Sequence, residues 1–290
     1  MMALLTRLGL GLLWLLHWLP MAWLAACGRW LGRLLYRVGH ERRHVVLTNL
    51  GLCFPQWSEE ERSALARRHF EAFGRSFLER GLLWWGAPER IRRLVRVEGG
   101  EHLATQQDRP LILLVPHFVG LDAAWTRLSM DRDMCSIYAN QKNPLFNTVL
   151  YRGRRRFGDP SLFSRQEGVR PAIKAMKAGK PFFYLPDLDY GRREAVFVPF
   201  FGVPAATITG LSRLARLSGA RVIPVITRMT DAGYVIEIAA PWTDFPGADV
   251  ESDTALMNAR IEAMVRELPD QYYWVHKRFK TRPPGKNKLY

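Results

Sequence analysis

Short apolar runs alternate with helical segments from residue 109 to the end of the 290-residue chain, and this alternation constrains the fold most. The run PLILLVP at 110–116 is continuously apolar, which is typical of a parallel strand that is buried on both faces. Further runs of this kind follow at 134–139, 181–186, 221–229 and 234–240. Because helical segments separate most of these runs, we predict an α/β fold with a mostly parallel central sheet flanked by helices.

The amino-terminal segment reads LGLGLLWLLHWLPMAWLAAC from Leu8 to Cys27 and carries no formal charge. Twenty helical residues extend about 30 Å, which is the thickness of a hydrocarbon core. One arginine precedes the segment and five follow it closely, so the positive-inside rule places the rest of the chain in the cytoplasm. We therefore predict an N-terminal membrane anchor helix within residues 1–28. His17 and Pro20 leave open a helix that lies in the membrane interface instead.

The residues LAAC at 24–27 allow a competing interpretation. They are similar to the processing site of a bacterial lipoprotein, with Cys27 as the lipidated residue. The arginines just beyond the cleavage point would oppose export, and the preceding segment is poor in charge. A retained anchor is therefore the preferred prediction.

Residues 29–108 are predicted to form a basic amphipathic and helical region next to the membrane. Arginines lie between apolar residues at helical spacing in its first part, as in helices on a membrane surface. An ordinary solvated helix face is the alternative. Ser58 and Glu61 make a capping box, which predicts the start of a helix that runs to about Trp85. The α/β core then occupies residues 109–290.

The formal charge of the chain is +15. A charge this high indicates an acidic partner, which composition alone does not identify as nucleic acid, anionic lipid or an acidic protein. The cysteines Cys27, Cys53 and Cys135 are scattered and lack CxxC spacing. Neither a disulfide framework nor a zinc site is therefore expected, and a reducing compartment fits best.

Two pairs of polar residues follow predicted strands at the point where each strand ends. His117 and Asp122 follow the first strand of the core, and Asp187 and Asp189 follow the strand at 181–186. In open α/β sheets, ligands bind beyond the carboxyl ends of the strands. We therefore expect both pairs at the same edge of the sheet.

His117 and Asp122 lie five residues apart, which on one continuous helix separates them by about 140°. They can meet only if His117 lies on the loop and Asp122 lies in the first turn of the next helix, a bend that Gly120 makes easier. Asp122 would then hold one ring nitrogen while the other accepts a proton from a hydroxyl. The alternative is a helix-capping aspartate beside an unrelated loop histidine.

H-x4-D is the signature of the glycerolipid acyltransferases. Here it lies in HFVGLD, the first of four sequence motifs: HFVGLD, DLDYG, VFVPFFGVPAAT and QYYWVHKRFKTRPPG. Together these motifs resemble the bacterial lipid A acyltransferases, the late enzymes that add secondary acyl chains to the lipid A precursor. The similarity runs from about Asn49 to Tyr290, and the hydrophobic amino terminus also fits. It implies a glycerolipid acyltransferase-like fold with residues 109–290 as the acyltransferase core.

The resemblance implies roles for individual residues. His117 would be the general base and Asp122 its orienting partner, and Arg154 would contact the oxyanion or a substrate phosphate. Asp187 and Asp189 would orient the substrate, with Arg154 as a second partner for Asp187. Basic residues of the terminal segment would contact phosphate or the acidic face of acyl carrier protein: His276, Lys277, Arg278, Lys280 and Arg282.

The implied reaction moves a fatty acyl chain from acyl carrier protein to a hydroxyl on an acyl chain of a Kdo-bearing lipid A precursor. A thioester is already activated, so a deprotonated hydroxyl can attack it directly and leave an oxyanion that needs stabilisation. Cys53 and Cys135 lie outside every matching motif, so we expect no acyl-enzyme intermediate. Neither a cofactor nor a metal is expected. The aromatic residues Phe197, Phe200 and Phe201 either shape the acyl channel or belong to the core.

The implied location is the bacterial inner membrane, with single-pass or tight association, membrane lipids as partners and the catalytic domain on the cytoplasmic side. Acylation of a lysophospholipid, an ornithine lipid or a phosphoinositide mannoside would use the same base and stays open, as does a non-catalytic lipid-binding protein. Nucleic acid is not an expected partner, because no recognition motif accompanies the charge. Acyl chain length, the acylated position, coenzyme A as donor and oligomeric state do not follow from these residues.

Overall fold

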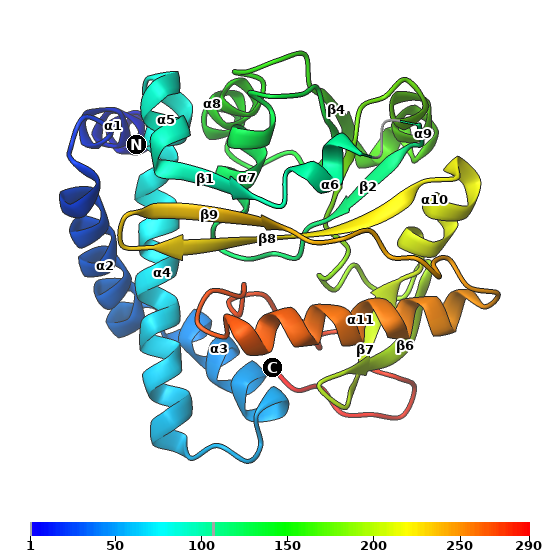
Figure 1. Cartoon of the computed structure of the whole chain (residues 1–290). Helices are drawn as coiled ribbons and strands as arrows, with labels where there is room; N and C mark the ends of the chain where they lie inside the picture. Colours follow the sequence, from blue (N-terminus) through cyan, green and yellow to red (C-terminus); the bar gives the residue numbers. More distant parts are fainter. Residues whose placement is uncertain (1, 106–107) are drawn as a thin grey trace.

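The computed structural model describes residues 2–105 and 108–290, in which an all-helical first part precedes alternating strands and helices (Figure 1). The helices are α1 (Met2–Leu16), α2 (Met21–Val38), α3 (His40–Cys53), α4 (Glu59–Trp85), α5 (Pro88–Leu94), α6 (Glu101–Ala104), α7 (Leu121–Leu128), α8 (Pro144–Arg154), α9 (Arg170–Lys177), α10 (Gly210–Ser218) and α11 (Val250–Glu267). The strands are β1 (Val95–Glu98), β2 (Leu111–Leu114), β3 (Cys135–Tyr138), β4 (Ser161–Ser164), β5 (Phe182–Tyr184), β6 (Ala195–Phe200), β7 (Val203–Ile208), β8 (Arg221–Thr230) and β9 (Gly233–Ile238), and a short 3₁₀ helix, η1, covers Arg165–Glu167.

The central sheet has the strand order β1-β9-β8-β2-β5-β3-β4 in the described residues. Each neighbouring pair is parallel except β8 and β9, which form an antiparallel hairpin. The prediction of a mostly parallel sheet flanked by helices is therefore confirmed. Strands β1 and β4 were not predicted from the sequence, because their segments, VRVE and SLFS, are short and partly polar.

Strand β2 is buried on both faces because its side chains alternate between two hydrophobic clusters. Ile112 and Leu114 pack in the cluster that contains residues of α9, α10 and α11. Leu111 and Leu113 pack in the cluster that contains residues of α7 and of the carboxyl-terminal half of α4. The continuous apolar run predicted this two-sided burial, which is typical of a parallel strand between helical layers.

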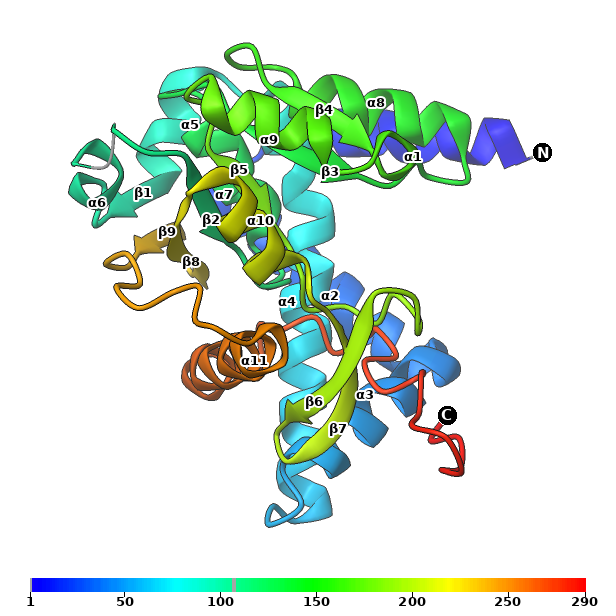
Figure 2. The same ribbon diagram turned by 90° about the vertical axis from the view of Figure 1, so that its right-hand side faces the viewer.

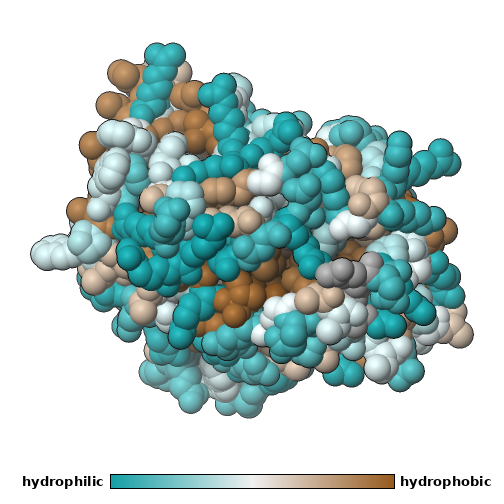
Figure 3. Space-filling model, turned by 45° about the horizontal axis from the view of Figure 1, so that its top comes forward, coloured by the Kyte–Doolittle hydropathy of each residue, from teal (hydrophilic) through white to brown (hydrophobic). Residues whose placement is uncertain are grey.

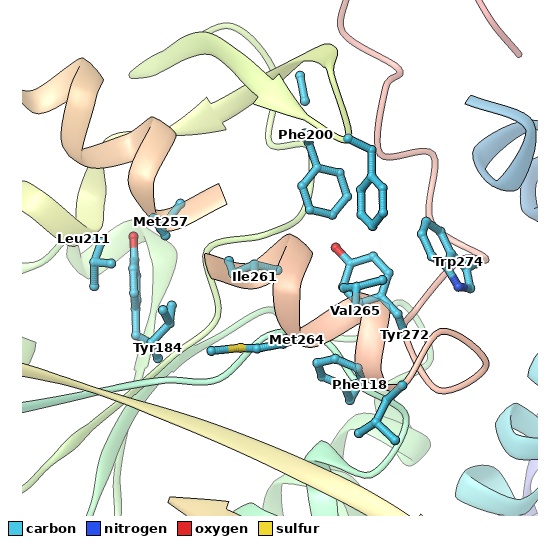
Figure 4. Close-up of a cluster of buried hydrophobic side chains, with 14 of the residues drawn as sticks. Phe118, Tyr184, Phe200, Leu211, Met257, Ile261, Met264, Val265, Tyr272 and Trp274 are labelled. Atoms are coloured by element: carbon cyan, nitrogen blue, oxygen red, sulfur yellow. The ribbon is translucent and has the colours of Figure 1, made fainter. Parts of the chain in front are cut away.

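Helix α11 closes the first of these clusters, below the sheet in Figure 1. Figure 4 shows its side chains Ile261 and Val265 among Phe118, Phe200 and Tyr272, which come from different segments of the chain. The antiparallel hairpin of β6 and β7 packs against α11, apart from the central sheet (Figure 2). This core supports the loop that follows β2 and the segment that follows α11. These two parts of the chain meet at the site.

Helices α2 and α4 pack at backbone contact because glycines face each other across the interface. A Cβ atom on Gly74 would lie 2.4 Å from the carbonyl oxygen of Gly28 and 2.5 Å from the amide nitrogen of Gly32. No real side chain fits at such distances. The amino-terminal helices are therefore part of the packed body rather than a detached anchor.

The predicted continuous helix from Leu8 to Cys27 is wrong: α1 ends at Leu16 and α2 begins at Met21. Pro20 precedes α2 and cannot continue α1, since its ring removes the backbone donor and clashes with the preceding turn. Arg90 donates hydrogen bonds to the carbonyl oxygens of His17 and Leu19, which the interrupted helix leaves without backbone partners. Within residues 2–105 and 108–290, no helix is long and apolar enough to cross a membrane.

The packing does not break at the predicted boundary of residue 109. Val46 and Leu65 share a cluster with residues of the sheet, and β1 pairs with β9 although it precedes the boundary. The capping box is confirmed, because Ser58 and Glu61 exchange side-chain to backbone hydrogen bonds at the start of α4.

Candidate functional site

The imidazole of His117 is held by Asp187, which lies 70 residues further along the chain. His117 Nδ1 lies 2.7 Å from Asp187 Oδ1, and the backbone N–H of His117 donates to Asp187 Oδ2 at 2.9 Å. Strand register explains the meeting, since Leu114 pairs with Tyr184 in the parallel strands β2 and β5. Each partner stands three residues beyond its paired position. The prediction that these polar residues share one sheet edge is confirmed for this pair.

The loop that carries His117 is fixed from its other side by the segment after α11. The backbone N–H of Tyr273 donates to the carbonyl oxygen of His117 at 2.9 Å, and Phe118 forms an isolated antiparallel bridge with Tyr272. In the neutral tautomer that donates its Nδ1 proton to Asp187, the imidazole presents the lone pair of Nε2. This is the protonation pattern that a general base requires.

Asp187 is 1% exposed and stays ionised at this site. Burial by itself would raise its pKa, but the charge of His117 and the hydrogen bonds from His117 hold the pKa below its usual value. The prediction that Asp187 orients Arg154 is wrong, because the structure directs both of its oxygens to His117.

No hydrogen bond joins the described side chains of Asp122 and His117, and the prediction that Asp122 orients the imidazole is wrong, because Asp187 holds the ring. Its oxygens accept hydrogen bonds from Arg80 Nε at 2.8 Å and from Arg154 Nη2 at 3.0 Å. The reason is geometric: Asp122 lies in the first turn of α7, and that turn aims its carboxylate toward α4 and α8. Burial would raise the pKa of Asp122, but the charges of Arg154 and Arg80 hold it well below its usual range.

A cavity of about 1310 Å³ joins these groups at the sheet edge, with His117, Asp122, Arg80 and Arg154 in its wall. This volume exceeds the ordinary range for small-molecule sites, about 300–1,000 Å³. Further charged residues also line it: Arg193, Glu194 and Arg213. Apolar side chains from several elements form much of the remaining lining: Ile137, Phe146, Leu150, Leu162, Phe182, Leu214 and Leu217. The cavity therefore combines charged groups with room for a long apolar ligand.

Asp189 is a structural residue, and the prediction that it orients substrate is wrong. It is 5% exposed, and its carboxylate accepts hydrogen bonds from the backbone and hydroxyl of Thr281 at 2.6 and 2.8 Å. The backbone N–H of Gly191 donates to it at 2.9 Å. These bonds tie the segment after β5 to the end of the chain.

Two basic residues of the terminal segment point inward, contrary to the prediction of phosphate or acyl-carrier contact. Arg278 is 2% exposed and donates to the Ala206 carbonyl at 2.9 Å and the Thr207 hydroxyl at 2.8 Å. His276 Nε2 accepts a hydrogen bond from the backbone of Asp189 at 3.0 Å. Burial, aided by the charge of His117, lowers the pKa of His276 to about 4, so its ring is neutral at physiological pH.

The three remaining basic residues of that segment reach the surface to different degrees. Lys280 is exposed, whereas Lys277 forms an ion pair with Glu41 at 3.3 Å. Arg282 donates to the carbonyl oxygen of Pro204 at 3.2 Å. For these three, contact with phosphate or acyl carrier protein stays a prediction.

The aromatic segment of β6 and β7 belongs mainly to the core. Phe200 and Phe201 are 0% and 8% exposed and pack in the cluster below the sheet, so an acyl-channel role for these two is wrong. Ile208 and the residues that follow it do line the cavity. On α10, Leu217 does not share the buried side of Leu211 and lies 64% exposed at the cavity.

Arg80 and Tyr273 belong to the site, although sequence analysis missed both. Arg80 lies on α4 and Tyr273 follows α11, so each is far from His117 along the chain. An arginine on a helix that carries several arginines and glutamates has no spacing signal that distinguishes it from its neighbours, and neither does a tyrosine in an aromatic motif.

Comparisons with known proteins give one consistent result. The family model of the bacterial lipid A biosynthesis acyltransferases matches residues 2–281. The lipid A biosynthesis lauroyltransferase of Escherichia coli K12 is 38% identical over 286 residues, which cover 97% of this chain and 93% of the relative. The palmitoleoyltransferase of the same organism is 35% identical, covering 99% and 94%. Its myristoyltransferase is 34% identical, covering 90% and 82%.

Proposed function

Because the chain belongs to the bacterial lipid A biosynthesis acyltransferase family and is an acyltransferase, we propose that it transfers a fatty acyl chain from acyl carrier protein to a hydroxyl of an acyl chain on a Kdo-bearing lipid A precursor. The observation that carries this proposal is the bond between His117 and Asp187 in the wall of a large, partly apolar cavity. A base in the wall of such a cavity can deprotonate an acceptor hydroxyl beside an apolar site that binds the acyl chain and excludes water.

His117 acts as the general base. Its Nε2 takes the proton of the acceptor hydroxyl while Asp187 stabilises the imidazolium that forms. The oxygen attacks the thioester carbonyl, forming a C–O bond and a tetrahedral oxyanion. Collapse of that intermediate breaks the C–S bond, and the imidazolium returns its proton to the leaving thiolate. Atoms and charge balance without a covalent enzyme intermediate.

The cysteines support direct attack. Cys53 and Cys135 are buried at 3% and 0% exposure, and neither side chain lines the cavity. Burial raises the pKa of both thiols, that of Cys135 to about 12, so neither is a thiolate at neutral pH. A thiol in this state is a poor nucleophile.

We assign stabilisation of the oxyanion to Arg154, which lines the same cavity as His117. Its bond to Asp122 fixes the guanidinium at the cavity wall, and its permanent charge is compensated by an ionised carboxylate. A preorganised donor of this kind stabilises charge that develops in the transition state. Asp122 thus acts on the reaction through Arg154, whereas Asp187 acts through His117.

Helix α1 supports association with a membrane surface. Its exposed side carries leucines that are 54% to 61% exposed: Leu4, Leu5, Leu8, Leu12 and Leu15. Three tryptophans between α1 and the middle of α2 are also 65% to 68% exposed: Trp18, Trp23 and Trp30. Figure 3 shows hydrophobic side chains gathered at the upper left, the side on which Figure 1 places α1. We propose that this leucine face inserts into the cytoplasmic side of the bacterial inner membrane, the membrane that holds the acceptor lipid.

The test is acyl transfer by the purified protein, followed by mass spectrometry of the lipid product. Acyl carrier protein thioesters of several chain lengths are supplied with the Kdo-bearing lipid A precursor. His117→Ala should lower kcat/KM by about 10²- to 10⁴-fold, the usual contribution of a general base. His44→Ala, an exposed histidine on α3, is the matched control and should match the wild type.

Parallel reactions with a lysophospholipid acceptor and with coenzyme A thioesters identify the true substrates. Equal lipid binding by wild type and His117→Ala, with no transfer by either to any acceptor, contradicts the proposed function.

A further inference from the structure

Arg80 and Arg154 share one carboxylate between two helices. Arg80 Nε donates to Asp122 Oδ2 at 2.8 Å, and Arg154 Nη2 donates to Asp122 Oδ1 at 3.0 Å. The arginines come from α4 and α8, and both line the cavity that holds His117. Their side chains are 26% and 27% exposed, compared with 11% for that of Asp122. The carboxylate therefore lies behind the two guanidinium groups.

The charges of this cluster do not cancel. An arginine side chain carries a permanent positive charge, and the two neighbouring arginines keep Asp122 ionised. Two positive charges face one negative charge, so this cluster leaves one positive charge in the cavity wall. A guanidinium has five N–H donors, and the bond to Asp122 uses only the Nε donor of Arg80. Among the described residues, no hydrogen bond engages the terminal nitrogens of Arg80.

We propose that Arg80 binds an anionic oxygen group of the acceptor lipid, a phosphate ester or a carboxylate. The planar fork of an arginine matches either group with two hydrogen bonds. This inference rests on the proposed function, because it names the part of the acceptor that the site recognises. Arg80 is then a specificity-determining residue, distinct from the base His117 and from the oxyanion group Arg154.

The position of Arg80 favours the acceptor over the thioester donor. Helix α1 packs against both α4 and α8, the helices that carry the two arginines. A lipid drawn from the surface beneath the leucine face of α1 would therefore approach the cavity from the side of these two helices. The apolar lining contributed by Ile137 of β3 and Leu214 of α10 packs with the cluster on the opposite side of the central strands from α7, and it offers room for the acyl chain of the donor.

The experiment compares Arg80→Gln and Arg80→Lys with the wild type on three acceptors: the intact precursor, a phosphatase-treated precursor and a precursor that lacks Kdo. Arg80→Gln should raise KM for the intact acceptor about 10- to 100-fold, as expected for lost charge-assisted hydrogen bonds, with kcat and the KM for the donor within about threefold. Arg80→Lys should restore part of the affinity, because it keeps the charge without the planar fork. Arg68→Gln, an exposed arginine on the same helix, is the control for charge removal and should leave KM unchanged.

The acceptor series identifies the recognised group. The effect of Arg80→Gln should disappear on the acceptor that lacks that group, phosphate or Kdo carboxylate. An equal rise in KM on all three acceptors, or a fall in kcat with KM unchanged, overturns the proposal and leaves Arg80 as a positioning residue for Asp122. Equilibrium binding of the precursor in detergent micelles gives the same comparison without turnover. If Arg80→Gln binds the precursor more weakly than both the wild type and Arg68→Gln, the proposal for Arg80 is supported. This holds even if the wild type transfers no acyl group, a result that would contradict only the proposed function.

Discussion

His117 Nδ1 and Asp187 Oδ1 lie 2.7 Å apart because strands β2 and β5 are parallel neighbours in register. A second Asp187 oxygen accepts the backbone N–H of the same histidine, so one buried carboxylate fixes both the loop and the ring. The site therefore consists of two separate units. One joins His117 and Asp187, and the other joins Asp122 with Arg80 and Arg154.

Asp187→Asn should lower kcat/KM by about 10²- to 10⁴-fold, because the imidazole loses the acceptor that sets its tautomer and the charge that stabilises imidazolium. The KM for the acceptor should change little, since Asp187 does not line the cavity. Steady-state kinetics on both substrates measures these values. Activity within about threefold of wild type would show that Asp187 does not serve the base.

Asp122→Asn and Arg154→Gln should be coupled. Each single substitution breaks the same ion pair at 3.0 Å, so the double variant should lose less activity than the product of the single losses. Asp122→Asn combined with Asp187→Asn provides the comparison, because these aspartates contact different partners. A double-mutant cycle on kcat/KM measures both couplings. Stronger coupling between the two aspartates than between Asp122 and Arg154 would contradict the two-unit site.

Gly74→Ala should lower the free energy of unfolding by about 1–3 kcal/mol, the usual cost of overpacking. Its new Cβ would lie 2.4 Å from the Gly28 carbonyl oxygen, so α2 and α4 must separate. Gly11→Ala is the matched control on α1, where a Cβ meets no atom within 4 Å. There the expected change is a gain of about 0.5–1 kcal/mol from the lower entropy of the unfolded chain. Denaturant titration measures both; equal effects would argue against the close helix contact.

Stability should fall as the pH drops from about 6.5 to about 4 because of His69. This side chain is fully buried on α4, and burial lowers its pKa to about 4, although a bond to the carbonyl oxygen of Asp270 acts in the opposite direction. In the unfolded chain the pKa returns to about 6.5. The unfolded state therefore binds the proton first, so the contribution is complete above pH 6.5 and is lost as the pH falls through 4.

The size of this contribution is on the order of 3 kcal/mol. His69→Gln should flatten the dependence of unfolding free energy on pH between 6.5 and 4.5, whereas exposed His44→Gln should not. The pKa of His276 is also lowered to about 4, by burial and by the charge of His117. His276 therefore leaves a smaller dependence of stability on pH in the same direction in the His69→Gln variant. Parallel slopes for His69→Gln and the wild type would exclude this role.

Polar substitution of the leucine face should weaken membrane association. Leu8→Gln with Leu12→Gln removes two apolar side chains that are 61% and 54% exposed. Binding to vesicles of anionic and zwitterionic lipid should fall by at least about tenfold, since burying one leucine contributes about 1.5–3 kcal/mol. Leu256→Gln, at 39% exposure on α11, is the control. Unchanged vesicle binding by the double variant would show that the leucine face of α1 does not contact the membrane.

Much of the fold was predictable because helices and buried strands depend on neighbours within a few residues. The apolar run of β2, the capping box at Ser58 and the family resemblance are all confirmed. The polar edge was predictable for the same reason, because His117 and Asp187 each follow a recognisable strand end. The interruption at Pro20 was also a local signal, but hydropathy outweighed it in the prediction of one continuous helix.

The sequence alone therefore determined the class of fold, the family and the set of polar residues from which the site is built. The tertiary structure decided their partners. Whether His117 meets Asp122 or Asp187 depends on strand order and register, which join residues 70 positions apart. The hydrogen bond of Arg278 to the β7 carbonyl of Ala206 likewise depends on where the β6–β7 hairpin packs. The bond of Arg80 to Asp122 depends on how α4 packs against α7. Local periodicity says which way a side chain leaves its own element, but a contact also needs the position of the other element.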